Sequence, residues 1–263
     1  MTDDYQYRFS GIGRLFGTNA LDVLQRAHVC VIGVGGVGAW AVEALARSGI
    51  GELTAIDWDD ICVTNVNRQL HAVDGEIGRA KVEALADRVK AINAGCRFHE
   101  CREFFSEASA ERILETPYDY VLDAIDSAKP KCLLIAMCRR RRIPVITVGG
   151  AGGRVDPTAV QVNDLSRSYD DPLLAQVRKK LRQEFGFPRE SRHRFRVECV
   201  FSAEAILYPQ PDGTVCHQRT TGSKMKLDCE SGYGTASFVT GAFGFAAASR
   251  IVRRLITRAE AKK

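Results

Sequence analysis

The sequence has no C-x-x-C pair, although it contains nine cysteines, at positions 30, 62, 96, 101, 132, 138, 199, 216 and 229. Structural zinc sites with four thiolate ligands usually take those ligands from two such pairs. A structural zinc site of this class is therefore not expected.

An apolar run long enough to span a membrane is also missing. The apolar stretch 237–249 includes Thr240 and Gly241 and falls short of the roughly twenty residues that a spanning helix needs. Its alanines and glycines suit close packing of a helix inside the protein or at a dimer interface. The basic segment 250–263 is expected to be exposed, and peripheral contact of this segment with a membrane surface stays open.

No secretion signal is visible at the N-terminus, because the first residues, MTDDYQYRFS, are polar and acidic. We therefore expect a cytoplasmic protein whose cysteines remain thiols. Internal repeats and low-complexity linkers are absent as well. With 263 residues, of which 45% are hydrophobic and 26% charged, the chain is expected to form one elaborated α/β unit.

Residues 29–60 have the pattern of a nucleotide-binding β–α–β unit. An apolar run at 29–32 predicts a buried parallel strand, and Gly33, Gly35, Gly36 and Gly38 follow it directly. A helical stretch at 39–47 leads to a second apolar run at 53–56, which ends in an acid. Such glycines let backbone N–H groups approach a phosphate at a helix N-terminus, and an acid at that place can bind ribose hydroxyls.

Charged and amide side chains follow the ends of several predicted strands. These residues are Asp57, Asp59, Asn65, Arg68, Lys81 and Asp126. Ligands bind at the carboxyl ends of strands in open α/β sheets, where arginine and lysine neutralise phosphates and carboxylates hold Mg²⁺. The set favours phosphoryl or nucleotidyl transfer from ATP over hydride transfer. The alternative is that Arg68 and Lys81 are only solvated helix charges.

Two resemblances rest on these motifs. About residues 8–150 resemble the adenylating domain of the ubiquitin-activating-enzyme superfamily. The motifs that carry this resemblance are, in chain order, G-x-G-G-x-G, D-x-D, N-x-x-R-Q, a lysine and D-x-x-D. Over nearly the whole chain, the segments ARSGIG, DDICVTNVNRQ, VGGAGG, CVFSAEAILYP and DCESGYG resemble the tRNA threonylcarbamoyladenosine dehydratases. This family cyclises a modified adenosine beside the anticodon.

The resemblance implies both a fold and an activity. The fold is α/β: a Rossmann-like, mostly parallel sheet with helices on both faces, with an ATP-binding adenylating domain at 1–165. A C-terminal α+β extension at 166–263 packs on it. The activity is ATP-dependent dehydration of threonylcarbamoyladenosine in tRNA, through an acyl-adenylate of the substrate carboxylate. ATP and Mg²⁺ are the implied cofactors, whereas dependence on a monovalent cation stays open.

The resemblance also implies roles for individual residues. The triphosphate loop would be formed by Gly33, Gly35, Gly36 and Gly38. The part of the site that binds the ribose would be formed by Asp57 and Asp59. Asn65, Arg68 and Lys81 would hold phosphates, and Asp126 would lie beside the metal. Arg68, Lys81 and Asp126 are thus the catalytic candidates of the ATP site.

Homodimerisation is a further implication of the resemblance. Helix 237–249 is the candidate for part of the contact, and Arg8 would reach a phosphate, in some relatives from the partner subunit. Arg14 lies close by in sequence and competes for that role. A sulfur-acceptor protein of a cysteine-desulfurase system is left open as a partner.

Segment 178–196, RKKLRQEFGFPRESRHRFR, is the candidate tRNA-binding element. It contains Arg178, Lys179, Lys180, Arg182, Arg189, Arg192, Arg194 and Arg196. Phe185, Phe187 and Phe195 are interleaved and are predicted to stack on bases, as in single-strand binding surfaces. The alternative is a solvated charged face, with the RNA held elsewhere, for example by residues 139–142.

Cys229, in a polar glycine-containing loop, is the candidate covalent nucleophile, because Lys224 or Lys226 could lower the pKa of its thiol. The alternative is an inert buried thiol beside two acids. Cys199 and Cys216 flank predicted strands and are expected in the core. The glycines at 149–153 either receive the acceptor substrate or form a plain turn.

Two rival functions remain at this point. One is an adenylyltransferase for the Gly-Gly tail of a ubiquitin-like sulfur carrier; the missing C-x-x-C pairs and the basic segment weigh against it. The other is a non-catalytic nucleotide-binding regulator, which would need fewer charges than Arg68, Lys81 and Asp126 provide.

Overall fold

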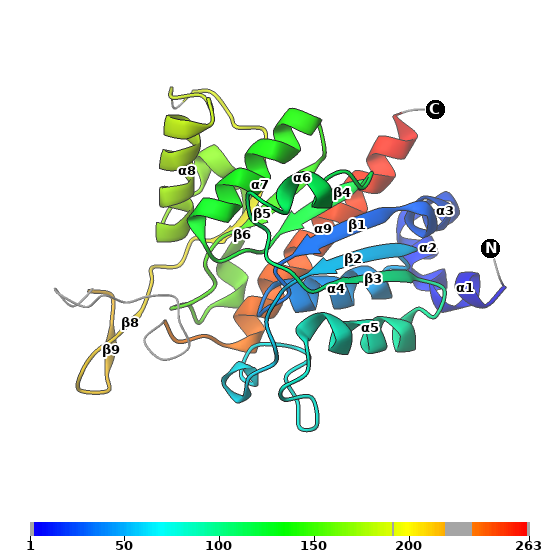
Figure 1. The fold of residues 1–263 in the computed structure, drawn as a ribbon, viewed down its shortest axis with the longest axis horizontal. Helices are drawn as coiled ribbons and strands as arrows, with labels where there is room; N and C mark the ends of the chain where they lie inside the picture. Colours follow the sequence, from blue (N-terminus) through cyan, green and yellow to red (C-terminus); the bar gives the residue numbers. More distant parts are fainter. Residues whose placement is uncertain (1–2, 191, 219–232, 262–263) are drawn as a thin grey trace.

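A mixed seven-stranded sheet forms the centre of the computed structural model, which describes residues 3–190, 192–218 and 233–261 (Figure 1). The strand order is β3-β2-β1-β4-β5-β7-β6, and every neighbouring pair is parallel except β6 with β7. The strands are β1 (His28–Ile32), β2 (Glu52–Ile56), β3 (Arg97–Cys101), β4 (Tyr120–Asp123), β5 (Val145–Val148), β6 (Val160–Asp164) and β7 (Glu198–Ser202). This architecture confirms the predicted α/β class.

Helices cover both faces of the sheet, as expected. One face carries α3 (Thr18–Arg26), α4 (Gly38–Arg47), α5 (Lys81–Ile92) and α9 (Ser237–Glu260), which share a core with Val29, Val31 and Leu53. The other carries α6 (Ala110–Ile113), α7 (Ala128–Arg141) and α8 (Pro172–Glu184), which share a core with Cys30 and Ile32. Because neighbouring residues of a strand point to opposite faces, buried β1 is apolar from Val29 to Ile32 and both layers pack against it.

Helix α9 differs from the prediction in length and in exposure. The apolar stretch 237–249 is only its first half, and the segment after it is not simply exposed, because Ile251, Val252, Leu255 and Ile256 are buried. Its small residues pack within the chain: a Cβ atom on Gly244 would lie 2.7 Å from the carbonyl oxygen of Val37. The glycine face of α9 is therefore occupied by α4 rather than free for a dimer contact. Among the described residues, no helix is long and apolar enough to cross a membrane.

The N-terminal helices α1 (Asp3–Arg8) and α2 (Ser10–Phe16) lie with α3 where the strands begin, on the right in Figure 1. The Tyr5 hydroxyl donates to the carbonyl oxygen of Gly49, just before β2, at 2.5 Å. The opposite edge of the sheet, where the strands end, is left open for a ligand.

The C-terminal part of the chain packs on the main sheet, as predicted, and also contributes a strand to it. Strand β7 pairs with β5, although it lies beyond the predicted boundary at residue 165. Cys199 is buried on β7, as predicted. Cys216 is only half-buried in the small hairpin of β8 (Tyr208–Pro209) and β9 (Val215–Cys216), so its predicted core position is wrong. Short connectors complete the described elements: η1 (Val63–Asn65), η2 (Pro157–Ala159) and η3 (Leu165–Arg167).

Candidate active site

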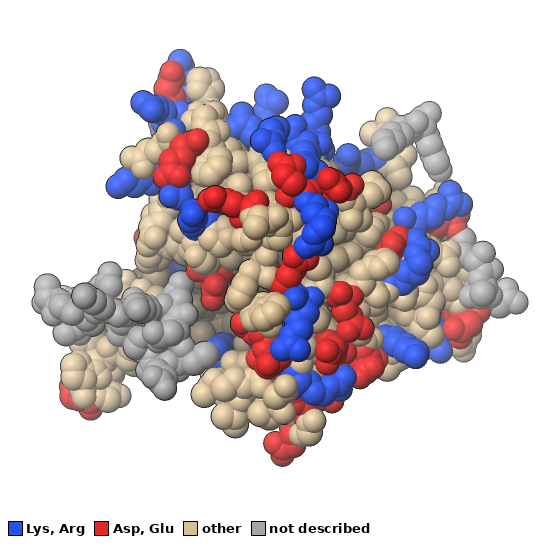
Figure 2. All heavy atoms as spheres, in the orientation of Figure 1, with Lys and Arg blue, Asp and Glu red and all other residues tan. Residues whose placement is uncertain are grey.

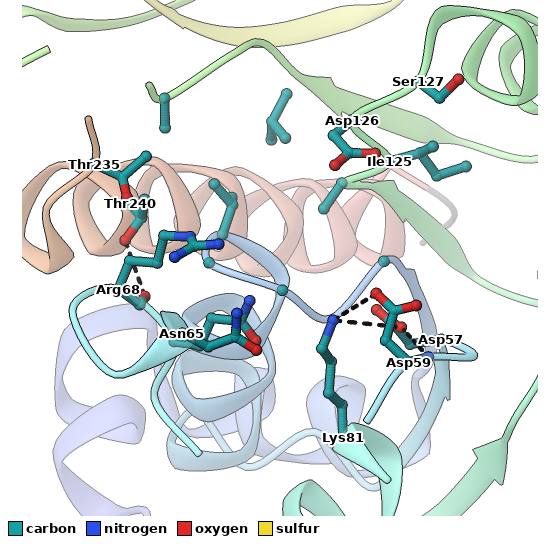
Figure 3. A pocket seen from close by; sticks show the side chains of 18 of the residues that line it. Asp57, Asp59, Asn65, Arg68, Lys81, Ile125, Asp126, Ser127, Thr235 and Thr240 are labelled. Atoms are coloured by element: carbon teal, nitrogen blue, oxygen red, sulfur yellow. Dashed lines mark hydrogen bonds and ion pairs between the residues drawn. The ribbon is translucent and has the colours of Figure 1, made fainter. Parts of the chain in front are cut away.

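A cavity of about 890 Å³ lies at the carboxyl ends of the central strands. Its walls include almost every residue predicted for the nucleotide site: Gly33, Gly35, Gly36, Asp57, Asp59, Asn65, Arg68, Lys81 and Asp126. Figure 3 shows Asp126 on the side opposite Asn65, Lys81 and Asp59, with the side chains facing the space between them. The fold thus brings together residues from four separate segments.

The glycine turn after β1 is fixed by its close contacts. Gly33 has a φ of +85°, and a Cβ atom there would lie 2.8 Å from the carbonyl oxygen of Ala124. Gly38 has a different role from the predicted one, because it does not line the cavity. A Cβ on Gly38 would lie 1.9 Å from the carbonyl oxygen of Gly33, so this glycine lets α4 begin directly against the turn.

Asp57 ties the glycine turn to the end of β2. Its Oδ2 accepts a hydrogen bond from the backbone N–H of Val34 at 2.8 Å, and its Oδ1 accepts one from the backbone N–H of Asp59 at 2.9 Å. Burial raises the pKa of the Asp57 carboxyl, although the charge of Lys81 opposes this. Each carboxylate oxygen keeps a second lone pair, so Asp57 can still accept from a ribose hydroxyl.

Lys81 is held between two acids at the base of the cavity. Its Nζ lies 2.7 Å from Oδ2 of Asp59 and 3.8 Å from Oδ1 of Asp57. The side chain is only 7% exposed, so the expectation of a freely solvated lysine is wrong. A buried ammonium group can act strongly on a phosphate, because little water screens it.

The backbone of Arg68 is held by hydrogen bonds from two helices that are distant in sequence. Its carbonyl oxygen accepts hydrogen bonds from Nε1 of Trp40 on α4, at 3.1 Å, and from Oγ1 of Thr240 on α9, at 3.2 Å. The guanidinium group donates to the carbonyl oxygen of Thr64 at 2.7 Å. Neither Trp40 nor Thr240 belongs to a nucleotide-binding motif, so sequence reasoning did not find them.

Two other cavity residues escaped the sequence analysis. Gln69 is buried and its Oε1 has no hydrogen-bond partner among the described residues, so an acceptor is available to a ligand. Cys62 is exposed at the rim, and hydrogen bonds from Thr64 lower the pKa of its thiol. The signal for Gln69 was present, since it directly follows Arg68 in the N-x-x-R-Q motif.

The loop that carries Asp126 is anchored by a buried charge pair. Oδ1 of Asp123, at the end of β4, accepts from the N–H of Ile125 at 3.2 Å. Its Oδ2 lies 2.9 Å from Nζ of Lys131 and accepts from the Thr147 hydroxyl at 2.7 Å. Asp126 itself is exposed and makes no hydrogen bond or ion pair with another described residue, so its carboxylate is available to a cation.

The glycine turn after β5 lies on the far side of the same cavity. Gly149 to Gly152 line the cavity. Asp171 fixes this turn: its Oδ2 accepts from the N–H of Gly150 at 2.8 Å, and a Cβ on Gly149 would lie 2.1 Å from the same atom. Asp171 is also the N-cap of α8.

Segment 178–196 contains half a helix and two buried aromatic rings. Residues 178–184 complete α8, and Phe187 and Phe195 pack against each other in the second core, 3% and 2% exposed. Their predicted stacking on bases is wrong, because no base can reach them. Arg139 and Arg182 instead cover these rings, with guanidinium carbons 4.3 Å and 5.0 Å from the ring centroids.

The basic side chains of this segment are unequally accessible. Arg178 is half-buried and bonds to the Ser168 hydroxyl, while Lys180 pairs with Glu184. The exposed members are Lys179, Arg189, Arg192, Arg194 and Arg196. Arg8, the predicted phosphate ligand, pairs with Asp4 on α1 and does not line the cavity of its own chain. Cys229, Lys224 and Lys226 lie outside the described residues.

Known proteins resemble the chain over its whole length. A family model described as the ThiF family matches residues 9–263. The tRNA threonylcarbamoyladenosine dehydratase of Escherichia coli K12 is 48% identical over 260 residues, which are 98% of this chain and 97% of that protein.

Solved structures give the same result. The E. coli tRNA N6-threonylcarbamoyladenosine dehydratase TcdA in complex with ATP has a TM-score of 0.89 and 43% identity, covering 100% of this chain and 99% of that one. The same protein in complex with AMP has a TM-score of 0.88 and 44% identity, covering 98% of both chains. These matches include every segment of the cavity from Gly33 to Thr240.

Proposed function

The chain belongs to the ThiF family, in its tRNA threonylcarbamoyladenosine dehydratase branch, and from that premise we propose that it uses ATP to dehydrate threonylcarbamoyladenosine in tRNA. One observation carries the proposal above the others. Lys81, Arg68 and Asp126 converge on a single cavity beside a glycine turn, in a chain that aligns end to end with a dehydratase solved with ATP.

The cavity accounts for ATP binding residue by residue. The backbone N–H groups of Gly35 and Gly36, just before α4, would face the phosphates, whereas those of Gly33 and Val34 already donate to Ile56 and Asp57. Lys81 and Arg68 supply positive charge, and Asp57 accepts from the ribose. Asn65 is buried with its Oδ1 accepting from the N–H of Cys62 at 3.0 Å, which leaves its amide N–H groups to donate.

The reaction begins with the carboxylate of threonylcarbamoyladenosine. A carboxylate oxygen attacks the α-phosphorus of ATP, and pyrophosphate leaves as the acyl-adenylate forms. A nitrogen or oxygen of the carbamoyl group then attacks the acyl carbon and expels AMP, which retains the carboxylate oxygen. The substrate has thereby lost the elements of one water molecule. Lys81 and Arg68 stabilise the charge that develops on the transferred phosphorus.

A divalent cation fits the same arrangement. Asp126 is the available carboxylate in the cavity, and hard oxygen ligands of this kind suit Mg²⁺. When bound with ATP, Mg²⁺ supplies charge neutralisation on the phosphates. Asp123 and Lys131 would act through Asp126, by holding its loop in place.

The tRNA is proposed to lie along α8. This 13-residue helix starts at the cavity, where Asp171 holds Gly150, and its second half, from residue 178, belongs to the basic segment. At 1.5 Å per residue the helix spans about 20 Å, a distance that phosphates of one RNA stem can bridge. Figure 2 shows lysines and arginines along the upper edge of the molecule, over α8 and the end of α7. The exposed residues Lys179, Arg189, Arg192, Arg194 and Arg196 would contact the backbone.

Several finer features belong to this proposal. A homodimer would allow Arg8 of one protomer to reach the other's site, which its own chain's geometry does not allow. The exposed face of α9, with Phe238 and Phe245, is the part of that helix left for such a contact. If light scattering gives a monomer at micromolar concentration, neither the action of Arg8 in the partner's site nor the dimer contact through α9 can hold. A monovalent cation, a sulfur-acceptor partner and the cytoplasmic location stay predictions.

The test compares two acceptors. The protein is incubated with ATP and Mg²⁺ and either threonylcarbamoyladenosine-containing tRNA or a ubiquitin-like sulfur carrier, and pyrophosphate release is measured. The proposal expects release with the modified tRNA, none with tRNA that lacks the modification, and none with the carrier. Pyrophosphate release with the carrier alone would support the rival adenylyltransferase function. The end-to-end match to dehydratases does not favour that function.

A further inference from the structure

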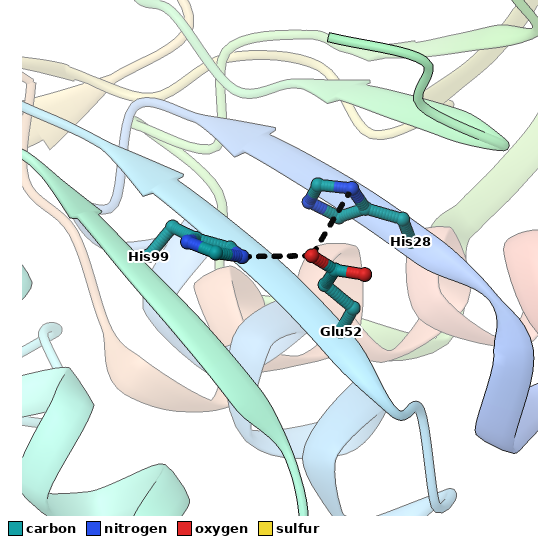
Figure 4. A group of neighbouring side chains, drawn as sticks. All are labelled: His28, Glu52 and His99. Carbon is teal, nitrogen blue, oxygen red and sulfur yellow. Dashed lines mark hydrogen bonds and ion pairs between the residues drawn. The ribbon is translucent and has the colours of Figure 1, made fainter.

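Three side chains with metal-binding atoms lie together far from the ATP cavity. His28 and Glu52 open β1 and β2, and His99 lies on the edge strand β3. Each offers one ligand atom, and these atoms all lie within 4.8 Å of one another. His28 pairs in register with Glu52, and His99 with Thr54, so all three project from one face of the sheet (Figure 4).

Space for a further ligand adjoins these side chains. A second cavity, of about 530 Å³, is lined by all three, and also by Arg112 and Tyr118. The cavity lies beside edge strand β3, where Arg97 and His99 are exposed. A bound ion there would keep a coordination position open to water or to a small anion.

The separations suit tetrahedral coordination. Nε2 of His99 lies 2.8 Å from Oε1 of Glu52, and Nδ1 of His28 lies 3.7 Å from the same oxygen. Ligands about 2.0–2.2 Å from a zinc ion are roughly 3.3 Å apart on a tetrahedron, so shifts of about half an ångström would bring each histidine nitrogen to that distance from Oε1 of Glu52. The ligand atoms of the two histidines lie within 4.8 Å of each other, and that separation would have to shorten by up to about 1.5 Å. Two imidazoles, one carboxylate and an open position form a well-known zinc ligand set.

Outer partners hold the ligands in the required orientation. Nε2 of His28 bonds to Oγ1 of Thr54 at 2.8 Å, which leaves Nδ1 facing Glu52. Arg97 donates to Oε2 of Glu52, which leaves Oε1 toward the two histidines. Such second contacts, which fix the tautomer and the carboxylate orientation, accompany most metal-binding histidines and carboxylates.

The protonation states agree with this geometry. Burial lowers the pKa of His28, against the opposing charge of Glu52. Burial of Glu52 is outweighed by hydrogen bonds from Arg97 and His99, which lower its pKa and keep it ionised. A neutral imidazole and a carboxylate are the forms that bind metals.

We propose that His28, Glu52 and His99 form a binding site for one divalent transition-metal ion, with zinc the ion that this ligand set favours. The site differs in kind from the four-thiolate zinc site that the missing C-x-x-C pairs argue against. It is independent of the proposed dehydratase activity, because it lies at the opposite ends of the strands. The competing explanation is a metal-free charge cluster in which Glu52 pairs with Arg97 and His99.

The test uses the full chain, freed of metal with EDTA, without ATP or tRNA. Zn²⁺ binding is measured by calorimetry, and Co²⁺ reports the ligand type by absorption. We expect one tight equivalent whose Co²⁺ spectrum lacks the near-ultraviolet thiolate band, which separates this site from the cysteines. His99→Ala should weaken binding by more than about 100-fold, and Thr54→Val, which removes an outer partner, by about tenfold.

Matched controls make each outcome decisive. His193→Ala removes a histidine that is 55% exposed and pairs with Glu190, and it should bind Zn²⁺ as the unaltered protein does. His99 is half-exposed on an edge strand, so His99→Ala should melt normally without metal but lose the rise in Tm that Zn²⁺ causes. The proposal fails if the unaltered protein binds no Zn²⁺ at micromolar concentration. It also fails if His99→Ala binds Zn²⁺ equally well.

Discussion

The Nζ atom of Lys131 lies 2.9 Å from Oδ2 of Asp123, and neither side chain is exposed to solvent. The pair lies directly beneath the loop that carries Asp126, to which Asp123 is joined through the N–H of Ile125. A buried ion pair contributes little net stability, but removing one partner leaves an uncompensated charge. The pair therefore links the stability of the fold to the geometry of the ATP cavity.

Lys131→Met tests this link. Loss of the ammonium group should lower the free energy of unfolding by about 3–5 kcal/mol, as measured by urea denaturation at pH 7. Burial already raises the pKa of Asp123, and without Lys131 that pKa rises further. Between the unfolded value, about 4, and the raised folded value, the folded variant binds the extra proton. Its free energy of unfolding should therefore increase as pH falls across that interval. If the free energy of unfolding of Lys131→Met were lower than that of the unaltered protein by the same amount at every pH, this account would be contradicted.

Lys81→Met tests the phosphate-binding role of the buried lysine. Loss of one preorganised positive charge should reduce ATP–pyrophosphate exchange by about 100- to 1,000-fold. The free energy of unfolding should fall less than in Lys131→Met, because Asp59 is 56% exposed and water can replace the lysine. Lys129→Met is the matched control, since Lys129 is 74% exposed and pairs with Glu107 away from the cavity. Exchange at the normal rate in Lys81→Met would remove this lysine from the mechanism.

Some of these features could be predicted from the sequence and others could not. The glycine turn, Asp57 and the parallel arrangement of the central strands follow from local patterns, because a strand, a tight turn and a helix are contiguous. Thr240 contacts Arg68 from 172 residues away, and no local pattern encodes that contact. Phe187 and Phe195 were assigned to the surface because the arginines around them dominate the composition. Those arginines in fact cover the buried rings.

The exposed arginines of segment 178–196 are expected to bind the tRNA backbone. With about four or five phosphate contacts, log affinity should fall with log salt at a slope of roughly −3 to −4.5. Replacing Arg192, Arg194 and Arg196 with alanine should weaken tRNA binding by orders of magnitude and flatten the slope by about two to three units. ATP binding should not change. Arg253→Ala with Arg258→Ala, on the exposed face of α9, is the control and should leave the slope unaltered.

The same experiment separates binding from folding. Phe187→Ala removes a buried ring and should cost about 3–5 kcal/mol of stability. At a temperature where the variant is still folded, its affinity for tRNA should be nearly normal. An arginine-triple variant that binds tRNA with the original slope would move the RNA to another surface, such as residues 139–142.

A covalent route, in which the Cys229 thiolate displaces AMP and the carbamoyl group then displaces the thiolate, is the alternative to direct ring closure on the adenylate. On that route, Cys229→Ser should lose turnover but still exchange pyrophosphate into ATP in the presence of the modified tRNA. Cys62→Ser is the informative comparison, because Cys62 lies at the cavity rim with a lowered thiol pKa. If Cys229→Ser turns over normally and Cys62→Ser does not, the nucleophile is Cys62. If both turn over normally, the ring closes directly on the adenylate.

Mass spectrometry of the tRNA nucleosides after incubation with ATP and Mg²⁺ tests the central claim most directly. The account predicts that threonylcarbamoyladenosine is converted to a product lighter by one water. One AMP and one pyrophosphate should form per conversion, and conversion should slow by about 100- to 1,000-fold with Lys81→Met. An unchanged nucleoside, from a protein that binds ATP and the modified tRNA, would contradict the assignment of this cavity to tRNA dehydration.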